Sequence, residues 1–274
     1  MPELPEVQTV ITYLSKKVPG HKITKIDMHY PKLLKNATVS QFQEFMVGET
    51  FTSISRKGKF LIFHLTNNKT FVVHLRMEGK LFVQAIGSEP SLKQLCAEIY
   101  LDDCVLRYYD TRKFGTFEIL NNSDPELLPS VHKLAIDAID EEFTGEFLFN
   151  KIHKSTKKIK TILLDQAVVA GLGNIYVNEV LFAARIHPER LGKDVSLEEC
   201  NAIAAHSKVI LQNAIAHNGT TIHSFKVNEL STGGYQEFLQ IHGRAKQPCK
   251  VCDTTIEFKK VNGRGTHFCP KCQK

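Results

Sequence analysis

Long apolar runs are missing from this 274-residue sequence, and so are the marks of a secreted chain. No stretch approaches the roughly 18 consecutive apolar residues that a membrane helix needs. The opening MPELPEVQTV is acidic and proline-rich, so it lacks the basic and apolar regions of a signal peptide. The seven cysteines are odd in number, which argues against a secreted disulfide framework. These absences predict a cytoplasmic chain with no membrane partner.

Excess positive charge is also absent from most of the chain. The sequence has 35 Lys and Arg against 29 Asp and Glu, for a formal charge of +6. Residues 242–274 hold eight of these bases and two of the acids, so residues 1–241 are neutral overall. A basic end of this kind predicts a sequence-independent hold on a polyanion.

The basic end carries two Cys-x2-Cys pairs separated by sixteen residues. Two such pairs can surround one metal ion, and four thiolates without an open position indicate structural rather than catalytic zinc. Free thiols or a redox pair are the alternative. The segment is too short to fold on an apolar core, so metal binding must supply much of its folding energy. We predict one zinc ion held by Cys249, Cys252, Cys269 and Cys272.

Apolar periodicity divides the rest of the chain into a strand-rich part and a helical part. It predicts a helix over residues 5–18, then short strands over about 22–120 that suggest a sandwich or barrel. The segment VSQFQEFMVG is a further helix candidate among these strands. After an acidic connection, helices dominate, and the last of them opens on the capping-box pair Ser196 and Glu199.

Glycines and lysines in the helical part suggest contacts to phosphate. Asn174 follows Gly171 and Gly173 between two helical patterns and fits as an N-cap, although an ordinary helix hairpin has the same signature. The upstream run KIHKSTKKIK has five lysines, which fit either a solvated face or a DNA backbone track. Arg264 stands between two glycines in the zinc segment and is either a nucleic-acid contact or a solvated turn residue. Together these features favour DNA.

The N-terminus offers a reactive amine. Removal of Met1 would make Pro2 the first residue, with a secondary amine whose reference pKa of ~7.7–8.0 is below the ~10.4 of lysine. Attack of that amine on a carbonyl carbon gives an iminium, which is an electron sink for elimination. Glu3 and Glu6 could act there as acid or base, or could simply favour the dipole of a helix start.

Six sequence blocks resemble the formamidopyrimidine-DNA glycosylase family. They are MPELPEV, RKGKFLIF, HLRMEGK, DTRKFGTFE, AGLGNIYVNEVLF and the zinc segment with GRGTHFCPKC. The blocks follow the family's order and span nearly the whole chain, with weaker similarity between them. The MPELPE opening is similar to the purine-lesion branch, whereas the endonuclease VIII branch typically begins MPEGPE.

The resemblance implies an α+β DNA-repair enzyme, a monomer of the bacterial nucleoid. It implies a catalytic β-sandwich domain with flanking helices over residues 1–133, a helix–two-turn–helix domain over 134–241 and a four-cysteine zinc finger over 242–274. Such an enzyme holds double-stranded DNA with an oxidised base between its domains. It flips out 8-oxoguanine or a formamidopyrimidine, cuts the N-glycosidic bond and nicks the strand by β,δ-elimination.

The resemblance also implies a role for each matched residue. Pro2 is the nucleophile, Glu3 is the general acid and base, and Lys59 and Arg264 complete the catalytic group, with Glu6 in support. The three residues that fill the void left by the flipped base are Met77, Arg112 and Phe114. The remaining DNA contacts are His74, Lys157, Asn174, Tyr176 and His223.

Four departures from the family pattern leave the catalytic groups intact. Gln8 stands where a Glu is usual, and His223 replaces an Arg or Lys in the lesion-recognition loop. The HDH-like segment near 93–95 and the GPEP-like segment near 135–137 are absent. Two alternatives stay open: the same lyase chemistry with a preference for oxidised pyrimidines, and a DNA lesion-binding protein without catalysis.

Overall fold

The computed structural model of the chain describes residues 1–221 and 232–274, and the chain divides into two compact units. The first unit comprises residues 1–132 and 218–234, and the second comprises 133–217 and 235–274. The architecture is α+β, with a β-sandwich in the first unit and helices with a small β-hairpin in the second, as predicted. Within the described ranges, no helix is long and apolar enough to cross a bilayer.

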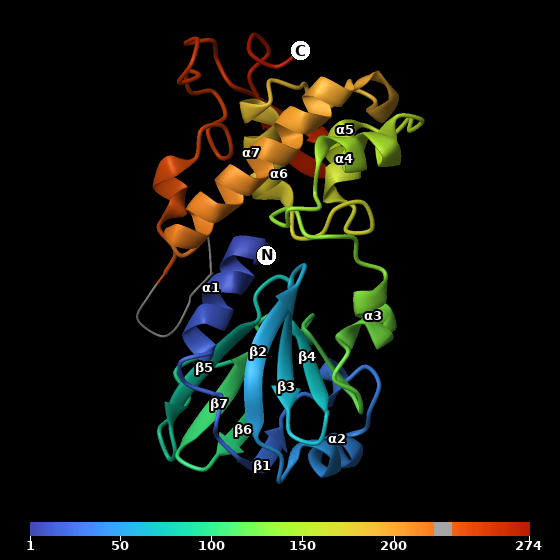
Figure 1. The fold of residues 1–274 in the computed structure, drawn as a ribbon. Coiled ribbons are helices and arrows are strands. Elements are labelled where there is room, and N and C mark those ends of the chain that lie inside the picture. The colour runs from blue at the N-terminus through green and yellow to red at the C-terminus, as the bar shows by residue number, and fades with distance from the viewer. Residues whose placement is uncertain (222–231) are drawn as a thin grey trace. The chain divides into compact units, whose positions relative to one another are not determined.

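Two antiparallel four-stranded sheets form the β-sandwich of the first unit. Figure 1 draws their strands as blue to green arrows. One has the strand order β1-β6-β7-β5 and the other β2-β3-β4-β8. Their β-branched and aromatic residues suit a pleated, half-buried surface. The strands are β1 Ile23–Met28, β2 Phe51–Lys57, β3 Phe60–Leu65, β4 Thr70–His74, β5 Lys80–Ala85, β6 Leu95–Leu101, β7 Cys104–Tyr109 and β8 Thr116–Leu120.

Helix α1 (Leu4–Leu14) begins the chain and packs its apolar face into the sandwich core. It ends before the predicted residue 18, because the chain turns from Ser15 into Pro19 and Gly20, and Gly20 has a φ of 91°. The predicted second helix is confirmed as α2 (Val39–Met46). The first unit also contains η1 Pro31–Leu33, η2 Pro125–Leu127 and α3 Pro129–His132.

Helices dominate the second unit, as the apolar periodicity predicts. Its longest helix, α7, begins at the predicted capping box: Ser196 N–H donates to Glu199, and Glu199 N–H donates to the Ser196 hydroxyl. Figure 1 shows α7 running across α6, against which it packs. The elements are α4 Gly145–Ile152, α5 Ile159–Leu164, α6 Asn174–Ala183, η3 Gly192–Asp194, α7 Leu197–Ala216, η4 Tyr235–Phe238, β9 Glu257–Val261 and β10 Arg264–Phe268.

Candidate functional site

Pro2 and Glu3 are buried just ahead of α1, and Glu3 is the N-cap residue of that helix. The Glu3 backbone N–H donates to Glu6 Oε2 at 2.8 Å. Both glutamates are 2 % exposed. A helix start favours negative charge through its unpaired N–H groups and its dipole. Local helix chemistry therefore holds two carboxyl groups beside the residue with the predicted nucleophile.

Glu6 also binds a segment that is far away in the sequence. Its Oε1 accepts a hydrogen bond from the Thr220 backbone N–H at 2.7 Å. The neighbouring Gly219 has a φ of 75°, and a Cβ there would lie 2.7 Å from Glu6 Oε1. Only glycine combines this positive φ with the lack of a Cβ that would clash with the Glu6 carboxylate. The Glu6 carboxylate thus joins the start of α1 to the chain that follows α7.

Lys59 lies in the two-residue turn between β2 and β3 and is 5 % exposed. Gly58 precedes it with a φ of 55°, which suits the first position of a type II′ hairpin turn. The Arg56 guanidinium donates through Nη1 to Gly58 O at 2.9 Å and through Nε to Gln8 Oε1 at 3.1 Å. Gln8, one of the departures from the family pattern, therefore ties α1 to the hairpin that carries Lys59.

His74 ends β4 and lies within the electrostatic reach of Lys59. Burial, and then the charges of Arg76 and Lys59, lower the pKa of His74 to about 3. The ring is consequently neutral near pH 7. Its Nδ1 accepts from the Arg76 backbone N–H at 2.9 Å, so Nε2 carries the proton and is the donor.

The three predicted void-filling residues lie on two turns. Met77 is half-buried between β4 and β5, because β4 ends at His74. Arg112 and Phe114 lie between β7 and β8, where the guanidinium covers the exposed Phe114 ring at 4.9 Å. A flat cation over an exposed ring forms a surface suited to stacking.

Asn174 is the first residue of α6, and Gly173 is the N-cap. The prediction of Asn174 as the N-cap is therefore wrong, because the chain reaches helical geometry one residue earlier than the glycine pattern suggests. Its Oδ1 is buried and has no hydrogen-bond partner within the described parts of the chain. Tyr176, two residues on, is fully buried, with its ring 6.1 Å from that of Tyr235.

The lysine run before α6 is less uniform than its sequence suggests. Lys157 is exposed, as are two of its neighbours, Lys151 and Lys154. Lys158 pairs with Glu189 at 2.5 Å, and hydrogen bonds from Lys158 and Lys259 lower the pKa of Glu189 to about 2. Lys160 is fully buried. Only part of the predicted basic track can therefore face a phosphate backbone.

The buried ammonium of Lys160 holds the β9–β10 hairpin. It donates to Asn178 Oδ1 at 2.8 Å, Gly265 O at 2.9 Å and Thr266 Oγ1 at 2.9 Å. Arg264 is exposed on the same hairpin, next to an Asn262–Gly263 turn whose two positive φ angles fit a type I′ hairpin. The sequence analysis placed Lys160 in an exposed basic run, and the structure shows that it is buried. Its apolar neighbours Ile159 and Ile162 were the sequence feature that could have indicated burial.

Glu179 is a second buried anchor that the sequence reading missed. It is 3 % exposed on α6, and its carboxylate accepts from the backbone N–H groups of Gln240, Ile241 and His242 at 2.8–3.0 Å. Burial raises the pKa of Glu179, and the three donors oppose that shift. An acid within the apolar run NEVLF was the available signal. Glu179 therefore fixes the backbone of residues 240–242, which lead into the cysteine segment.

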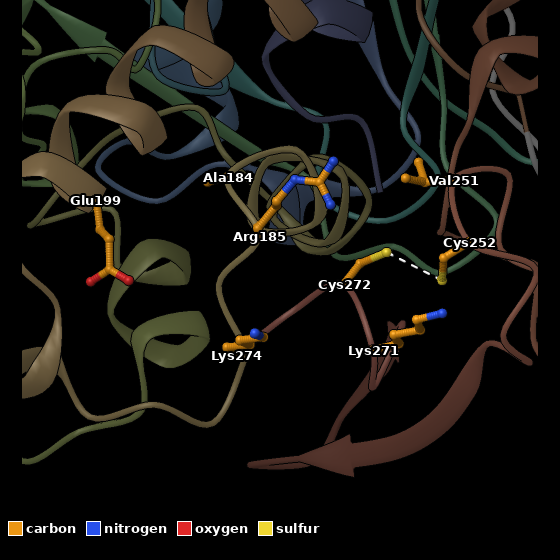
Figure 2. Close-up of a pocket in the computed structure, with 8 residues that line it drawn as sticks. All are labelled: Ala184, Arg185, Glu199, Val251, Cys252, Lys271, Cys272 and Lys274. Carbon is orange, nitrogen blue, oxygen red and sulfur yellow. Dashed lines mark hydrogen bonds between the residues drawn. The ribbon is translucent and has the colours of Figure 1, made fainter.

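The sulfur atoms of Cys249, Cys252, Cys269 and Cys272 all lie within 4.8 Å of one another. Three Sγ–Sγ distances fall at 3.3, 3.5 and 3.9 Å, close to the ~3.8 Å edge expected for a tetrahedral ZnS4 centre. Figure 2 shows Cys252 and Cys272 converging beside Lys271. The arrangement fits one structural zinc ion, as predicted.

His223, the remaining residue predicted to contact DNA, lies outside the described residues.

Three family models match this chain in succession. They are the formamidopyrimidine-DNA glycosylase N-terminal domain over residues 1–117, its H2TH domain over 134–226 and the zinc finger found in FPG and IleRS over 246–274. A formamidopyrimidine-DNA glycosylase of Mycoplasma pneumoniae is 46% identical over all of this chain and 99% of its own length. The chain belongs to the formamidopyrimidine-DNA glycosylase family. One from Ureaplasma parvum is 44% identical over the full length of both chains.

Solved structures of this glycosylase family have the same fold. A crystal structure of a Lactococcus lactis FPG mutant with DNA containing Fapy-dG superposes with a TM-score of 0.93, at 39% identity, over all of both chains. A structure of MutM with DNA containing carbocyclic 8-oxo-G gives a TM-score of 0.90 at 38% identity, again over all of both chains. These relatives bind lesion-containing DNA.

Proposed function

We propose that this chain excises oxidised purines from duplex DNA and then nicks the strand through the amine of Pro2. The glycosylases of this family remove 8-oxoguanine and formamidopyrimidine lesions and have lyase activity at abasic sites. The main structural support for these catalytic residues is the cluster at the start of α1. Pro2 and Glu3 are buried there, and the Glu6 carboxylate accepts hydrogen bonds from the backbone N–H groups of Glu3 and Thr220.

The proposed chemistry begins once Met1 has been removed. The Pro2 nitrogen attacks C1′ of the damaged nucleotide, the N-glycosidic bond breaks, and the base leaves with the bonding electrons and a proton. Glu3 supplies and removes protons as the deoxyribose ring opens to an iminium. Loss of the C2′ proton expels the 3′ phosphate, and a second elimination expels the 5′ phosphate. The iminium nitrogen accepts the electrons in each elimination.

The remaining predicted residues have binding roles in this proposal. Met77, Arg112 and Phe114 occupy the void left by the flipped base, because unstacking costs a few kcal/mol that inserted side chains partly recover. Lys59 and Arg264 remain members of the proposed catalytic group and act from the phosphates at the lesion. Neutral His74 donates from Nε2, a role that needs no protonation at pH 7. The other DNA-facing residues in the proposal are Lys157, Asn174, Tyr176 and His223.

The other parts of the proposal concern organisation. The functional domains are residues 1–133, 134–241 and 242–274, and the last is a zinc finger with one ion. The Oδ1 of Asn174 at the start of α6 is buried and has no partner among residues 1–221 and 232–274, which supports a ligand at that helix end. The protein acts as a monomer on double-stranded DNA in the bacterial cytoplasm, in association with the nucleoid.

Cleavage of a duplex with one 8-oxoguanine tests this function. The wild-type enzyme should excise the base and nick the strand, and it should do so faster than on a thymine glycol duplex. Pro2→Gly should lower nicking by more than about 1000-fold while DNA affinity stays within about threefold, since only the nucleophile is lost. Retention of Met1 should give the same result. Normal nicking by either variant would remove Pro2 from the mechanism, and faster cleavage of thymine glycol would reverse the lesion preference.

A further inference from the structure

The phenol of Tyr108 stands where the two turns with the predicted void-filling residues meet. A Cβ placed on Gly79, which closes the Met77 turn, would lie 2.4 Å from Tyr108 Oη. A Cβ placed on Gly115, which closes the Arg112 and Phe114 turn, would lie 1.8 Å from the same oxygen. Both turns therefore press their backbone against one side-chain atom, and a larger residue at either glycine would displace it.

The sandwich core holds the Tyr108 ring in place. The side chain is 1 % exposed, and its ring meets Phe117 edge to face at a centroid distance of 4.9 Å. In the ladder between β5 and β7, Tyr108 pairs with Leu81, two residues after Gly79. A ring packed in the core on a paired strand leaves its hydroxyl with little freedom to follow a moving loop.

Asp110 connects this hydroxyl to the backbone of the second turn. Its Oδ1 accepts from the Arg112 N–H at 3.0 Å, and its Oδ2 accepts from the Gly115 N–H at 2.8 Å and from the Tyr108 hydroxyl at 3.3 Å. The side chain is 1 % exposed. Burial, and then the charge of Asp110, raise the pKa of Tyr108, so the phenol stays protonated and can donate.

We propose that Tyr108 and Asp110 are positioning residues that lock the Met77 turn and the Arg112–Phe114 turn into one rigid unit. This inference rests on the proposed function, because it assigns the unit to insertion into the DNA base stack. Both residues are 1 % exposed, so in this proposal they act through the turns and not by contact with DNA. Rigid turns lose less conformational freedom on insertion than independent loops, so the locked pair favours opening of the stack. Base removal needs that insertion, whereas an abasic site has no base left to expel.

The test compares two reactions of the same enzyme under single-turnover conditions at saturating protein. Tyr108→Phe should slow 8-oxoguanine excision by about 3–10-fold, the range for loss of one buried hydrogen bond. Asp110→Asn should slow it by about 10–100-fold, since its amide turns a donor towards backbone N–H groups. Both variants should nick a preformed abasic site within about twofold of the wild-type rate.

Tyr109→Phe is the matched control. Tyr109 neighbours Tyr108 on β7 and is equally buried, but its hydroxyl bonds Gln84 and the Ser91 backbone rather than the two turns. It should lose thermal stability as Tyr108→Phe does and keep wild-type excision. Equal slowing of excision in both phenylalanine variants, or equal slowing of excision and abasic nicking in Tyr108→Phe, would show a general loss of structure and overturn the proposal.

A binding measurement separates this inference from the proposed chemistry. A 2-aminopurine opposite a tetrahydrofuran abasic analogue brightens when inserted side chains open the stack, and no bond is cut. Tyr108→Phe should bind this duplex with wild-type affinity and give a smaller fluorescence rise. An unchanged rise would overturn the locking role even if excision is slowed. A wild-type enzyme that gives the rise but cuts neither substrate would instead overturn the proposed function.

Discussion

The two units of the molecule hold their functional groups by different means. In the first, a large apolar core of both sheets and α1 surrounds the groups, and buried carboxylates such as Glu6 and Asp110 bind backbone N–H groups around them. In the second, the apolar cluster at the cysteines is small and includes the zinc ligands themselves. Lys160 and Glu179 add buried polar anchors there. The apolar core of the first unit can therefore support its fold without the groups at the start of α1. The β9–β10 hairpin that carries Arg264 instead depends for its fold on the zinc ion and on the buried side chains of Lys160 and Glu179.

Loss of zinc should give the largest effect and should be confined to the second unit. Cys249→Ser, or chelation, should release the ion and unfold the hairpin, because structural zinc contributes roughly 10–16 kcal/mol in comparable small domains. DNA affinity, measured by fluorescence anisotropy, should fall by about 100-fold as the ordered basic surface is lost. Calorimetry should show the β-sandwich transition unchanged.

The control for zinc loss is Cys104→Ser, which removes a half-buried thiol from β7 in the first unit. It should retain the metal and the DNA affinity. If DNA affinity persists in a zinc-free Cys249→Ser protein, the zinc segment has no part in DNA binding and the comparison between the units fails.

Gly219→Ala should disturb the first unit at its polar link. The new Cβ would lie 2.7 Å from Glu6 Oε1 at a φ of 75°, so the Glu6–Thr220 hydrogen bond must lengthen. Left-handed backbone strain alone is worth about 1–2 kcal/mol. We expect a tenfold or greater fall in the excision rate, on the order of what a small displacement of neighbouring catalytic groups causes.

Gly20→Ala separates strain from contact. Gly20 has a φ of 91°, and nothing lies within 4 Å of its would-be Cβ. This variant should lose similar thermal stability and keep normal excision. Equal loss of excision in the two variants would mean that backbone strain, and not the Glu6 contact, accounts for the effect of Gly219→Ala.

Gln8→Glu should give the smallest effect and should strengthen the first unit. The new carboxylate would replace the neutral acceptor of Arg56 Nε, and hydrogen bonds between charged partners are roughly twice as strong as neutral ones. At this partly exposed pair we expect about 0.5–1 kcal/mol of added stability, visible as a higher melting temperature. A lower melting temperature would show that Gln8 makes a better contact here than the usual Glu.

Local signals made part of the structure predictable from sequence. The four cysteines, the capping box at Ser196 and the helix start near Pro5 follow from spacings of a few residues. The predicted zinc site and α+β fold are confirmed. The roles of the matched side chains stay predictions, because the family resemblance alone carries them.

The buried polar anchors could not be predicted because their partners are remote in sequence. Lys160 bonds residues 105 and 106 positions away, and Glu6 bonds a backbone group 214 positions away. No periodicity reports such pairs. The error at Asn174 has a related cause, since helix ends depend on which backbone groups find partners in the fold.

The position of the covalent bond in a borohydride-trapped complex tests the central claim most directly. The wild-type enzyme should be incubated with abasic-site DNA, reduced, digested and analysed by mass spectrometry. We predict a DNA adduct on the N-terminal peptide at Pro2, with none when Met1 is retained. An adduct on Lys59 or another lysine, or no adduct at all, would contradict the assignment of the chemistry to the first amine of the chain.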